Sequence, residues 1–153
     1  MRTRRTPRLP ALTVALALLS GAAGAADEAG IVKVSKGKAV VERDGQSLPA
    51  TVGAKVFASD RIVTGADGAV GITLRDNTML SAGPNSTVEL RQFAYDSTTQ
   101  AGAIDASVRR GTLSVISGKI AKVSPSSVRF STPKSTLGVR GTEFVIDAGD
   151  GEI

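Results

Sequence analysis

Most of this chain consists of short segments in which every second residue is apolar, separated by turn residues. In the segment 69–74, for example, Val70, Ile72 and Leu74 fall on one face of an extended strand. Residues typical of turns recur about every eight to twelve residues, and beyond residue 25 no window shows the i, i+3, i+4, i+7 spacing of an amphipathic helix. The pattern predicts an all-β domain of many short strands in one compact unit, either sandwich-like or a short twisted β-solenoid.

The same alternation predicts where the strands lie. The last of them contains Gly138 and Gly141 on either side of Val139-Arg140, so the backbone there is free to adopt a positive φ or to approach a neighbouring strand closely. Phe144 then returns to a core face. The predicted strands are 30–35, 38–43, 60–64, 69–74, 79–82, 87–91, 104–108, 112–116, 120–123, 128–132 and 137–146.

The beginning of the chain has the pattern of an export signal. Four arginines lie among the first eight residues, and the apolar run 11–19 that follows is too short to span a bilayer. Ala23-Gly24-Ala25 then fits the small-residue pattern that a signal peptidase cleaves. We therefore expect residues 1–25 to be a signal-peptide helix and residues 26–153 to form one domain in the periplasm or outside the cell, with no membrane span after cleavage.

The charge balance changes once the signal is set aside. The whole chain carries 19 Lys and Arg against 14 Asp and Glu, but four of the basic residues lie in the signal, which leaves 15 against 14. After the signal, Arg109-Arg110 is the only adjacent basic pair. Because no basic stripe could follow a phosphate backbone, we expect no nucleic-acid partner.

The composition also limits the chemistry. The chain has no His and no Cys, which excludes zinc sites built on nitrogen and sulfur ligands, cysteine nucleophiles and every Ser-His-Asp arrangement. It has only five aromatic residues and no Trp, so it is poorly equipped to stack sugar rings or nucleobases. These absences favour a binding protein over an enzyme.

Two short motifs resemble catalytic ones, but their context differs. Ser131-Thr132-Pro133-Lys134 matches the S-x-x-K motif of penicillin-binding proteins and β-lactamases, in which the serine begins a helix; here Pro133 and the extended pattern predict a strand or a turn. The stretch 111–119 resembles a phosphate-binding loop, but its glycine spacing is wrong and Ile120 stands where Ser or Thr would hold Mg²⁺. We expect no enzymatic activity, no cofactor and no metal site.

A set of motifs resembles the FecR domain family. The most specific part is Thr132-Pro133 followed by Leu137-Gly138-Val139-Arg140-Gly141-Thr142-Glu143-Phe144. Earlier signatures of the family correspond to Asp60, Ile62, Thr64-Gly65, Asp67-Gly68, Pro84-Asn85-Ser86, Gly111-Thr112-Leu113 and Ser117-Gly118-Lys119. The resemblance covers about residues 30–146, with Ser59 at a position where the family often has glycine.

The resemblance implies a bacterial envelope domain, named after a membrane regulator that senses an occupied outer-membrane siderophore receptor and controls a sigma factor. Here a cleavable signal stands where that regulator has a sigma-binding segment and a membrane helix, and the chain stops where members of the family usually continue with further strands. We therefore expect a stand-alone, exported FecR-like module. Its signature residues are expected to be structural or to face a partner: Asp60, Thr64, Gly111, Gly118, Thr132, Pro133, Gly138, Arg140, Gly141, Thr142 and Phe144.

Two functions remain open at this stage. The first is a non-enzymatic binding or signalling module that contacts another envelope protein through its sheet edges and the 138–144 segment. The alternative is a structural protein associated with the cell wall or with a polysaccharide, because FecR-like domains also occur beside wall-binding modules. The sequence does not specify the partner, the stimulus or the oligomeric state.

Overall fold

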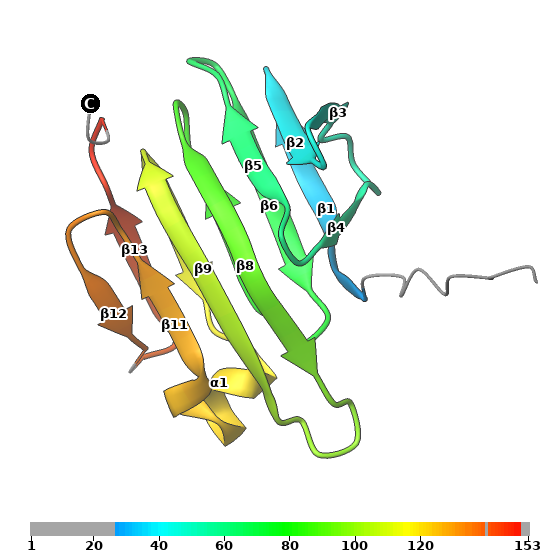
Figure 1. Ribbon diagram of the computed structural model, residues 1–153, viewed down its shortest axis with the longest axis vertical. Helices are drawn as coiled ribbons and strands as arrows, with labels where there is room; N and C mark the ends of the chain where they lie inside the picture. Colours follow the sequence, from blue (N-terminus) through cyan, green and yellow to red (C-terminus); the bar gives the residue numbers. More distant parts are fainter. Residues whose placement is uncertain (1–26, 140, 151–153) are drawn as a thin grey trace, which may run out of the picture.

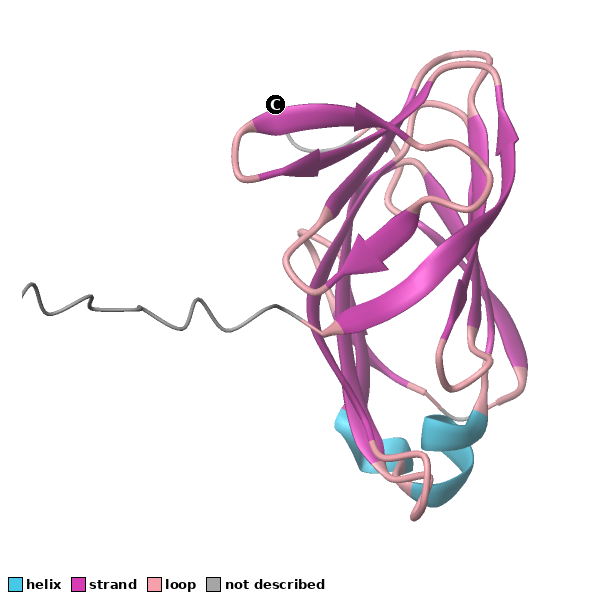
Figure 2. Cartoon of the chain, turned by 90° about the vertical axis from the view of Figure 1, so that its right-hand side faces the viewer, coloured by secondary structure: helices cyan, strands magenta, loops and turns pink. Residues whose placement is uncertain are grey.

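The computed structural model describes residues 27–139 and 141–150 as two β-sheets packed face to face (Figures 1 and 2). The predicted signal peptide and Arg140 lie outside the described residues. Sheet A contains, in spatial order, β13 (Glu143–Asp147), β10 (Thr112–Ile116), β7 (Met79–Ala82), β6 (Ala69–Leu74), β1 (Glu28–Lys36) and β4 (Lys55–Phe57).

Sheet B is the layer nearer the viewer in Figure 1. It contains, in spatial order, β12 (Thr136–Gly138), β11 (Val128–Ser131), β9 (Gly102–Arg110), β8 (Thr87–Tyr95), β5 (Arg61–Thr64), β2 (Ala39–Arg43) and β3 (Gln46–Pro49). A short helix, α1 (Lys119–Val123), and a 3₁₀ turn, η1 (Pro125–Ser127), lie at one end of the sandwich, as Figure 2 shows. The predicted all-β class is confirmed.

The chain winds back and forth between the sheets as it advances across them. From the β3 and β4 edge to the β12 and β13 edge, both sheets add later strands on the same side, except that β3 and β4 lie outside β2 and β1. All neighbours pair antiparallel apart from β9 and β11, which are parallel because β10 and α1 intervene. The molecule is therefore a sandwich that grows in one direction, which combines the two architectures that the sequence suggested.

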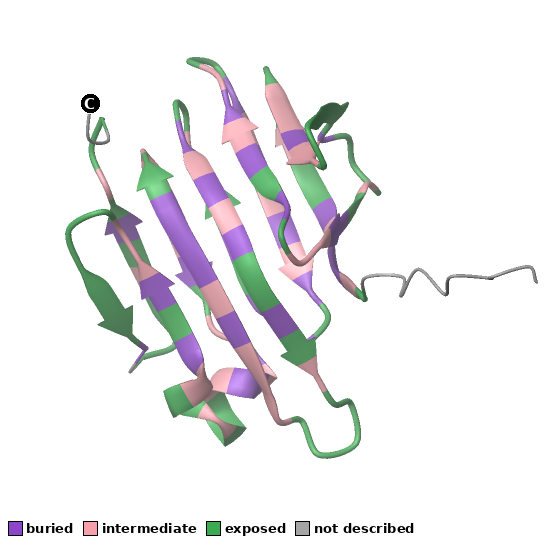
Figure 3. Cartoon of the chain, viewed as in Figure 1, coloured by how far each residue is buried: buried purple, intermediate pink, exposed green. Residues whose placement is uncertain are grey.

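The core lies between the two sheets and follows the predicted alternation. In β6, Val70, Ile72 and Leu74 are buried, and in β8 Val88 and Leu90 are buried. Figure 3 shows the resulting stripes along the strands. The remaining large buried side chains include Val32, Val56, Ile62, Leu80, Phe93, Ile104, Val108, Leu113, Val115, Ile120, Val128, Phe130 and Ile146.

The prediction of a strand at 120–123 is wrong, because this segment is part of α1. In so short a segment a two-residue period cannot be separated from a helical turn, since Ile120 is its only buried residue. The hydrogen bonds at the helix start decide the outcome. The Lys119 amide donates to the Asp76 backbone oxygen at 2.8 Å, and the Ile120 amide donates to the Asp76 carboxylate at 3.2 Å.

The predicted strand 137–146 is also wrong as a single element. Its first part lies in β12 of sheet B and its second part in β13 of sheet A, so the chain changes sheet between them. Gly141, with φ of +156°, lies in this crossing, as the flanking glycines indicated. The sequence did not predict β3 and β4, because neither shows apolar alternation: β3 is exposed throughout, and β4 has only three residues.

Gly111 occupies the crossing from β9 to β10 with φ of +76°. A Cβ there would overlap the Ser86 hydroxyl and the Ser86 backbone. Gly45, in the β2–β3 turn, has the same φ of +76°, but a Cβ at that position has no atom within 4 Å. At either position the positive φ would strain a residue other than glycine, but only at Gly111 would its Cβ also clash with neighbouring atoms.

We predict that Gly111→Ala lowers the free energy of unfolding by about 3 kcal/mol, because a left-handed backbone and an overlap at a buried crossing add together. Gly45→Ala should cost only about 1 kcal/mol, which is the backbone strain alone. Urea denaturation of both variants measures the difference. Equal losses would show that crowding at Gly111 is relieved without cost.

Candidate functional site

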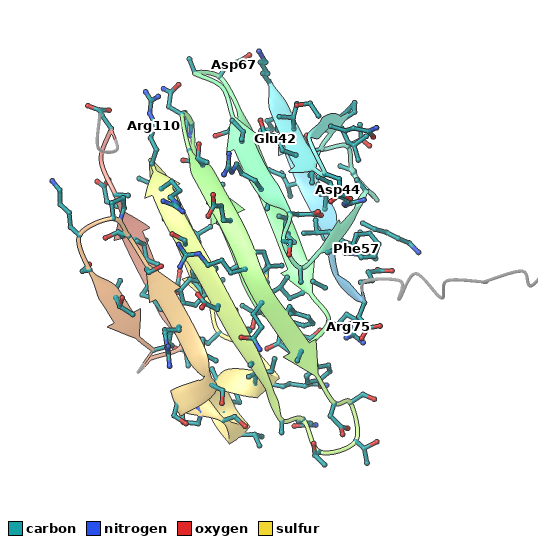
Figure 4. All side chains as sticks on the ribbon, in the orientation of Figure 1. Glu42, Asp44, Phe57, Asp67, Arg75 and Arg110 are labelled. Atoms are coloured by element: carbon teal, nitrogen blue, oxygen red, sulfur yellow. The ribbon has the colours of Figure 1, made fainter. Side chains whose placement is uncertain are left out.

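The first signature residue, Asp60, ties the two sheets together where β4 leads into β5. Its buried carboxylate accepts hydrogen bonds from Arg43 Nε at 2.7 Å and Arg43 Nη2 at 2.6 Å, and from the Phe57 amide at 2.8 Å. The Arg43 guanidinium also lies 4.5 Å from the centre of the Phe57 ring. Figure 4 shows Asp44 and Phe57 at this corner of the molecule. Because β4 is in sheet A while β2 and β5 are in sheet B, the bidentate pair clamps the layers at this edge.

The second group lies where β5, β8 and β10 begin or end. Thr64 Oγ1 donates to the Gly83 carbonyl at 2.6 Å and accepts from the Ser86 amide at 2.9 Å. Ser86 Oγ in turn accepts from the Thr112 amide at 3.0 Å. Thr64 and Ser86 are both buried, so these hydroxyls satisfy backbone groups that have no strand partner.

A third polar group surrounds Asp76 at the opposite end of the sandwich. Asp76 is fully buried, and its carboxylate accepts from the Thr78 amide at 3.0 Å, from Thr78 Oγ1 at 2.7 Å and from the Ile120 amide at 3.2 Å. Thr78 Oγ1 accepts from the Gly118 amide at 3.1 Å. A Cβ at Gly118 would overlap the backbone of Asp76, which explains the glycine by close approach and not by a phosphate.

These groups assign structural roles to Asp60, Thr64, Gly111 and Gly118. The sequence identified the four residues but missed their partners Arg43 and Thr78, as well as the anchoring role of Asp76. The Asp76-Asn77-Thr78 turn carried a usable signal, because an Asp followed two residues later by a Thr is typical of a turn closed by side chains.

The remaining signature residues that the structure describes lie at the β12 and β13 edge. Thr132 closes the β11–β12 turn: its amide donates to the Ser135 carbonyl at 2.8 Å, and its Oγ1 accepts from the Ser135 amide at 3.1 Å. Pro133 is exposed within this turn. The crossing from β12 to β13 is fixed to the end of β10 by Ser117, which donates from its amide to the Thr142 carbonyl at 2.7 Å and from its Oγ to the Gly141 carbonyl at 3.0 Å.

This edge is open and partly apolar. Every residue of β12 is exposed, as Figure 3 shows, and 39% of Leu137 and 67% of Val145 are accessible. Phe144 is half-buried and packs edge-on against Phe130, with ring centroids 5.5 Å apart. A groove of about 390 Å³ lies between the β11–β12 turn and β13, and Leu137, Val145 and Ile146 line it together with Pro133, Lys134 and Asp147.

The alternation of an antiparallel ladder identifies the backbone groups at this edge. Because Thr132 and Ser135 are hydrogen-bonded across the turn, the next bonded pair is Phe130 with Leu137. The amide and carbonyl groups of Thr136 and Gly138 consequently point away from β11. The structure thus brings an unpaired strand edge and a partly apolar groove together at the segment that carries the most specific motif.

Another groove lies on the outer face of sheet B, with a volume of about 590 Å³. It lies beside a network in which Glu89 pairs with Arg61 at 2.6 Å, with Arg109 at 3.2 Å and with Arg91 at 3.9 Å. Burial disfavours the charge on Glu89, but hydrogen bonds from Arg61 and Arg109 outweigh burial and lower the pKa of Glu89. Glu89 and its arginine partners therefore neutralise one another, which makes this part of the surface polar and ion-paired.

The S-x-x-K motif does not form a catalytic pair. Ser131 ends a β-strand, with its Oγ buried and without a hydrogen-bond partner among the described atoms, and Lys134 is exposed in the turn that follows. Among residues 27–139 and 141–150, no group of three or more carboxylates could hold a metal ion. In the same part of the chain, no helix has the length and apolar character needed to cross a bilayer.

A family model described as "FecR protein" matches residues 60–153, from the Asp60 clamp through the β12 and β13 edge. This match covers more than half of the chain. The chain belongs to the FecR family. A comparison with curated proteins and one with solved structures each found no match. Membership in the FecR family indicates a signalling-related regulatory module.

Ser59, where the sequence comparison above led us to expect glycine, has a backbone conformation that fits this expectation. Ser59 adopts φ of +74°, a left-handed conformation that favours glycine. We predict that Ser59→Gly raises the free energy of unfolding by about 1 kcal/mol. As a control, Ser47→Gly in the exposed strand β3 should lower it by about 0.5 kcal/mol. Thermal or urea denaturation provides both values, and a loss of stability in Ser59→Gly would contradict the explanation.

A second prediction concerns pH. Because the folded state lowers the pKa of Glu89, its ion pairs stabilise the protein above the ordinary Glu pKa of about 4.3 and lose this effect as the pH falls through the lowered value. Glu89→Gln should therefore cost about 1 kcal/mol at pH 7, with the difference from wild type shrinking below about pH 4. Urea denaturation at a series of pH values measures this. Glu42→Gln, which removes a single exposed pair at 3.6 Å, should have little effect at any pH.

Proposed function

We propose that this FecR-family protein is an exported, non-enzymatic binding module of the bacterial envelope, which contacts another envelope protein through β12 and the 138–144 segment. In this proposal residues 1–25 are removed on export, and residues 26–153 act as a single domain in the periplasm or outside the cell. The observation that carries the proposal is the unpaired edge of β12 beside a groove of mixed apolar and polar lining.

The chemistry of the edge favours an extended peptide strand as the partner element. The outward amide and carbonyl groups of Thr136 and Gly138 offer hydrogen bonds of the kind that a sheet makes to an added strand. Leu137 and Val145 offer apolar surface to alternate side chains of that strand. The opposite edge strand of sheet B, β3, is also exposed, but it contains Pro49, which has no amide to donate to an added strand.

The arrangement of the aromatic residues argues against the alternative of a polysaccharide-associated protein. All five aromatic side chains lie in the described residues, and none is exposed. The ring face of Phe57 is covered by Arg43, and that of Phe93 by Arg75 with the guanidinium 5.6 Å from the ring centre. Sugar-binding surfaces commonly present an open ring face, and the faces of Phe57 and Phe93 are not open in this way.

Crosslinking in intact cells tests the proposal. A photoreactive amino acid replaces Leu137 on β12 or, as a control, Leu48 on β3; both are on edge strands of sheet B, with 39% and 38% of the side chain exposed. We predict an adduct with one defined envelope protein from position 137 and none from position 48. An adduct from neither position, together with retention of the protein on purified peptidoglycan, would support the cell-wall alternative instead.

A backbone test at Gly138 separates strand addition from side-chain contact. A Cβ at Gly138 has no atom within 4 Å, so Gly138→Ala fits and keeps the outward amide, whereas Gly138→Pro removes that amide without breaking the pairing of β12 with β11. The adduct from position 137 should persist in Gly138→Ala and fall about tenfold in Gly138→Pro. Equal adduct formation in both variants would contradict strand addition.

A further inference from the structure

The outer faces of the two sheets differ in charge. On sheet B, the outer face carries the network around Glu89, with Arg61, Arg91 and Arg109. On sheet A, the three central strands β6, β7 and β10 carry no charged residue on their outer face. Their outward residues are Ala69, Gly71, Thr73, Met79, Ser81, Thr112, Ser114 and Ile116.

The strand register arranges the outer face of sheet A in three rows that run across the strands. The first row is Glu143, Ile116, Met79, Thr73, Ile31 and Lys55. The second row is Val145, Ser114, Ser81, Gly71 and Val34. The third row begins with Asp147 and Thr112 and ends with Ala69 and Lys36.

The ends of the rows differ in charge. The β13 end of the first and third rows is acidic, through Glu143 and Asp147. The other end of the third row is basic through Lys36, whereas Lys55 at the end of the first row already pairs with Glu28 at 3.2 Å. The second row has valine at both ends, Val145 and Val34. The centre of the face is apolar or small, and Met79 and Ile116 are neighbours there with 46% and 40% of their surface accessible. A soluble domain seldom leaves such a surface uncovered unless it binds something.

We propose that the outer face of sheet A binds the same face of a second copy of this chain, forming a twofold dimer whose axis runs parallel to the strands near β7. A rotation about such an axis exchanges the left and right ends of every row. It places Asp147 opposite Lys36 of the second copy and Val145 opposite Val34, and each contact occurs twice. A twofold axis across the strands would instead set acid against acid, which charge repulsion disfavours.

Charge complementarity is what identifies a second copy as the occupant. An unrelated partner would need its own acidic and basic margins at the matching separation, whereas a second copy has them by symmetry. Neither Glu143 nor Asp147 lies within ion-pair distance of a cation among the described residues, and the same holds for Lys36 and an anion. The outer face of sheet B is less suited to such packing, because a dimer formed through that face would bury the charges around Glu89.

The size of the face sets the expected affinity. Six strands about 4.8 Å apart and about five residues long give a face of about 25 Å by 17 Å. The two copies together bury about 850 Å², which is below the range of stable specific complexes, so we expect a weak dimer that dissociates at micromolar concentrations. The interface does not involve β12, but it shares Val145 and Asp147 of β13 with the groove beside β12. The tests at position 137 and at Gly138 therefore report on the binding edge, and those at Lys36 and Ser81 report on the dimer.

The mass in solution is the first test. Sedimentation equilibrium of the protein produced from the full chain should give twice the monomer mass at concentrations of about 100 µM and the monomer mass well below 1 µM. Ser81→Lys adds a charge at the centre of the face, beside the axis, and should weaken association more than tenfold. Gln92→Lys adds the same charge at an exposed position of β8 in sheet B and should leave the association unchanged. A monomer throughout would overturn the proposal.

Charge reversal tests the direction of the axis. Lys36→Glu and Asp147→Lys should each weaken association about tenfold, and the double variant should restore it, because each altered residue then faces an opposite charge again. Restoration requires Lys36 and Asp147 to meet across the axis. If the double variant is weaker than both single variants, the two residues do not meet and the axis is wrong.

The absence of cysteine permits a direct measurement of proximity. Packed sheets lie about 10 Å apart, which exceeds the Cα separation of a disulfide, so a short bis-maleimide is the suitable reagent. In the variant Ser81→Cys, position 81 of one copy should be crosslinked to position 81 of the second copy, since this position lies beside the axis. Gln92→Cys, on the other sheet, should not. Equal crosslinking of the two variants would indicate random collision and would contradict the proposed face.

Discussion

A chain that alternates between two stacked sheets must turn at the ends of the sandwich, above the core, and this requirement governs the structure. The backbone amides and carbonyls of these crossings have no neighbouring strand to pair with, and leaving them buried and unpaired would be costly. Four side chains form hydrogen bonds with the backbone of these crossings, namely those of Asp60, Thr64, Ser86 and Asp76. Three of these residues, Asp60, Thr64 and Ser86, belong to the motifs by which this chain resembles the FecR family, and all three lie at crossings between the sheets.

The one-directional winding also makes the two ends of the sandwich unequal. At the first end, the Arg43 and Asp60 pair joins β2 and β5 of sheet B to β4 of sheet A. At the last end, β12 and β13 lie in different sheets and are held by their inner neighbours, by Ser117 and by the backbone of Gly111. A growing sandwich always ends in unpaired strands unless something covers them. Here the unpaired strands coincide with the most specific sequence motif of the family.

The sequence predicted those features that depend on a local pattern. The alternation in β6 and β8 identified the buried faces, because a half-buried strand imposes a period of two. It could not identify α1, whose start is determined by Asp76, more than forty residues earlier in the chain. It also could not show that residues 137–146 belong to two sheets, since both parts alternate in the same way and only long-range pairing separates them. The partner of Asp60 was hidden for the same reason, because Arg43 reaches it from another strand.

Alternation along a strand indicates which residues are buried, but the outer residues acquire meaning only when the register aligns them across strands. Once aligned, the outer face of sheet B becomes an ion-paired network and that of sheet A an uncharged surface with an acidic and a basic margin. The two proposed surfaces have different centres, β12 in sheet B and β7 in sheet A, and they meet at Val145 and Asp147 of β13. A twofold axis near β7 would carry the two β12 edges to opposite sides of the dimer. Such a dimer could hold two partner strands at once, and a partner that is itself clustered would be bound more tightly than one edge alone allows.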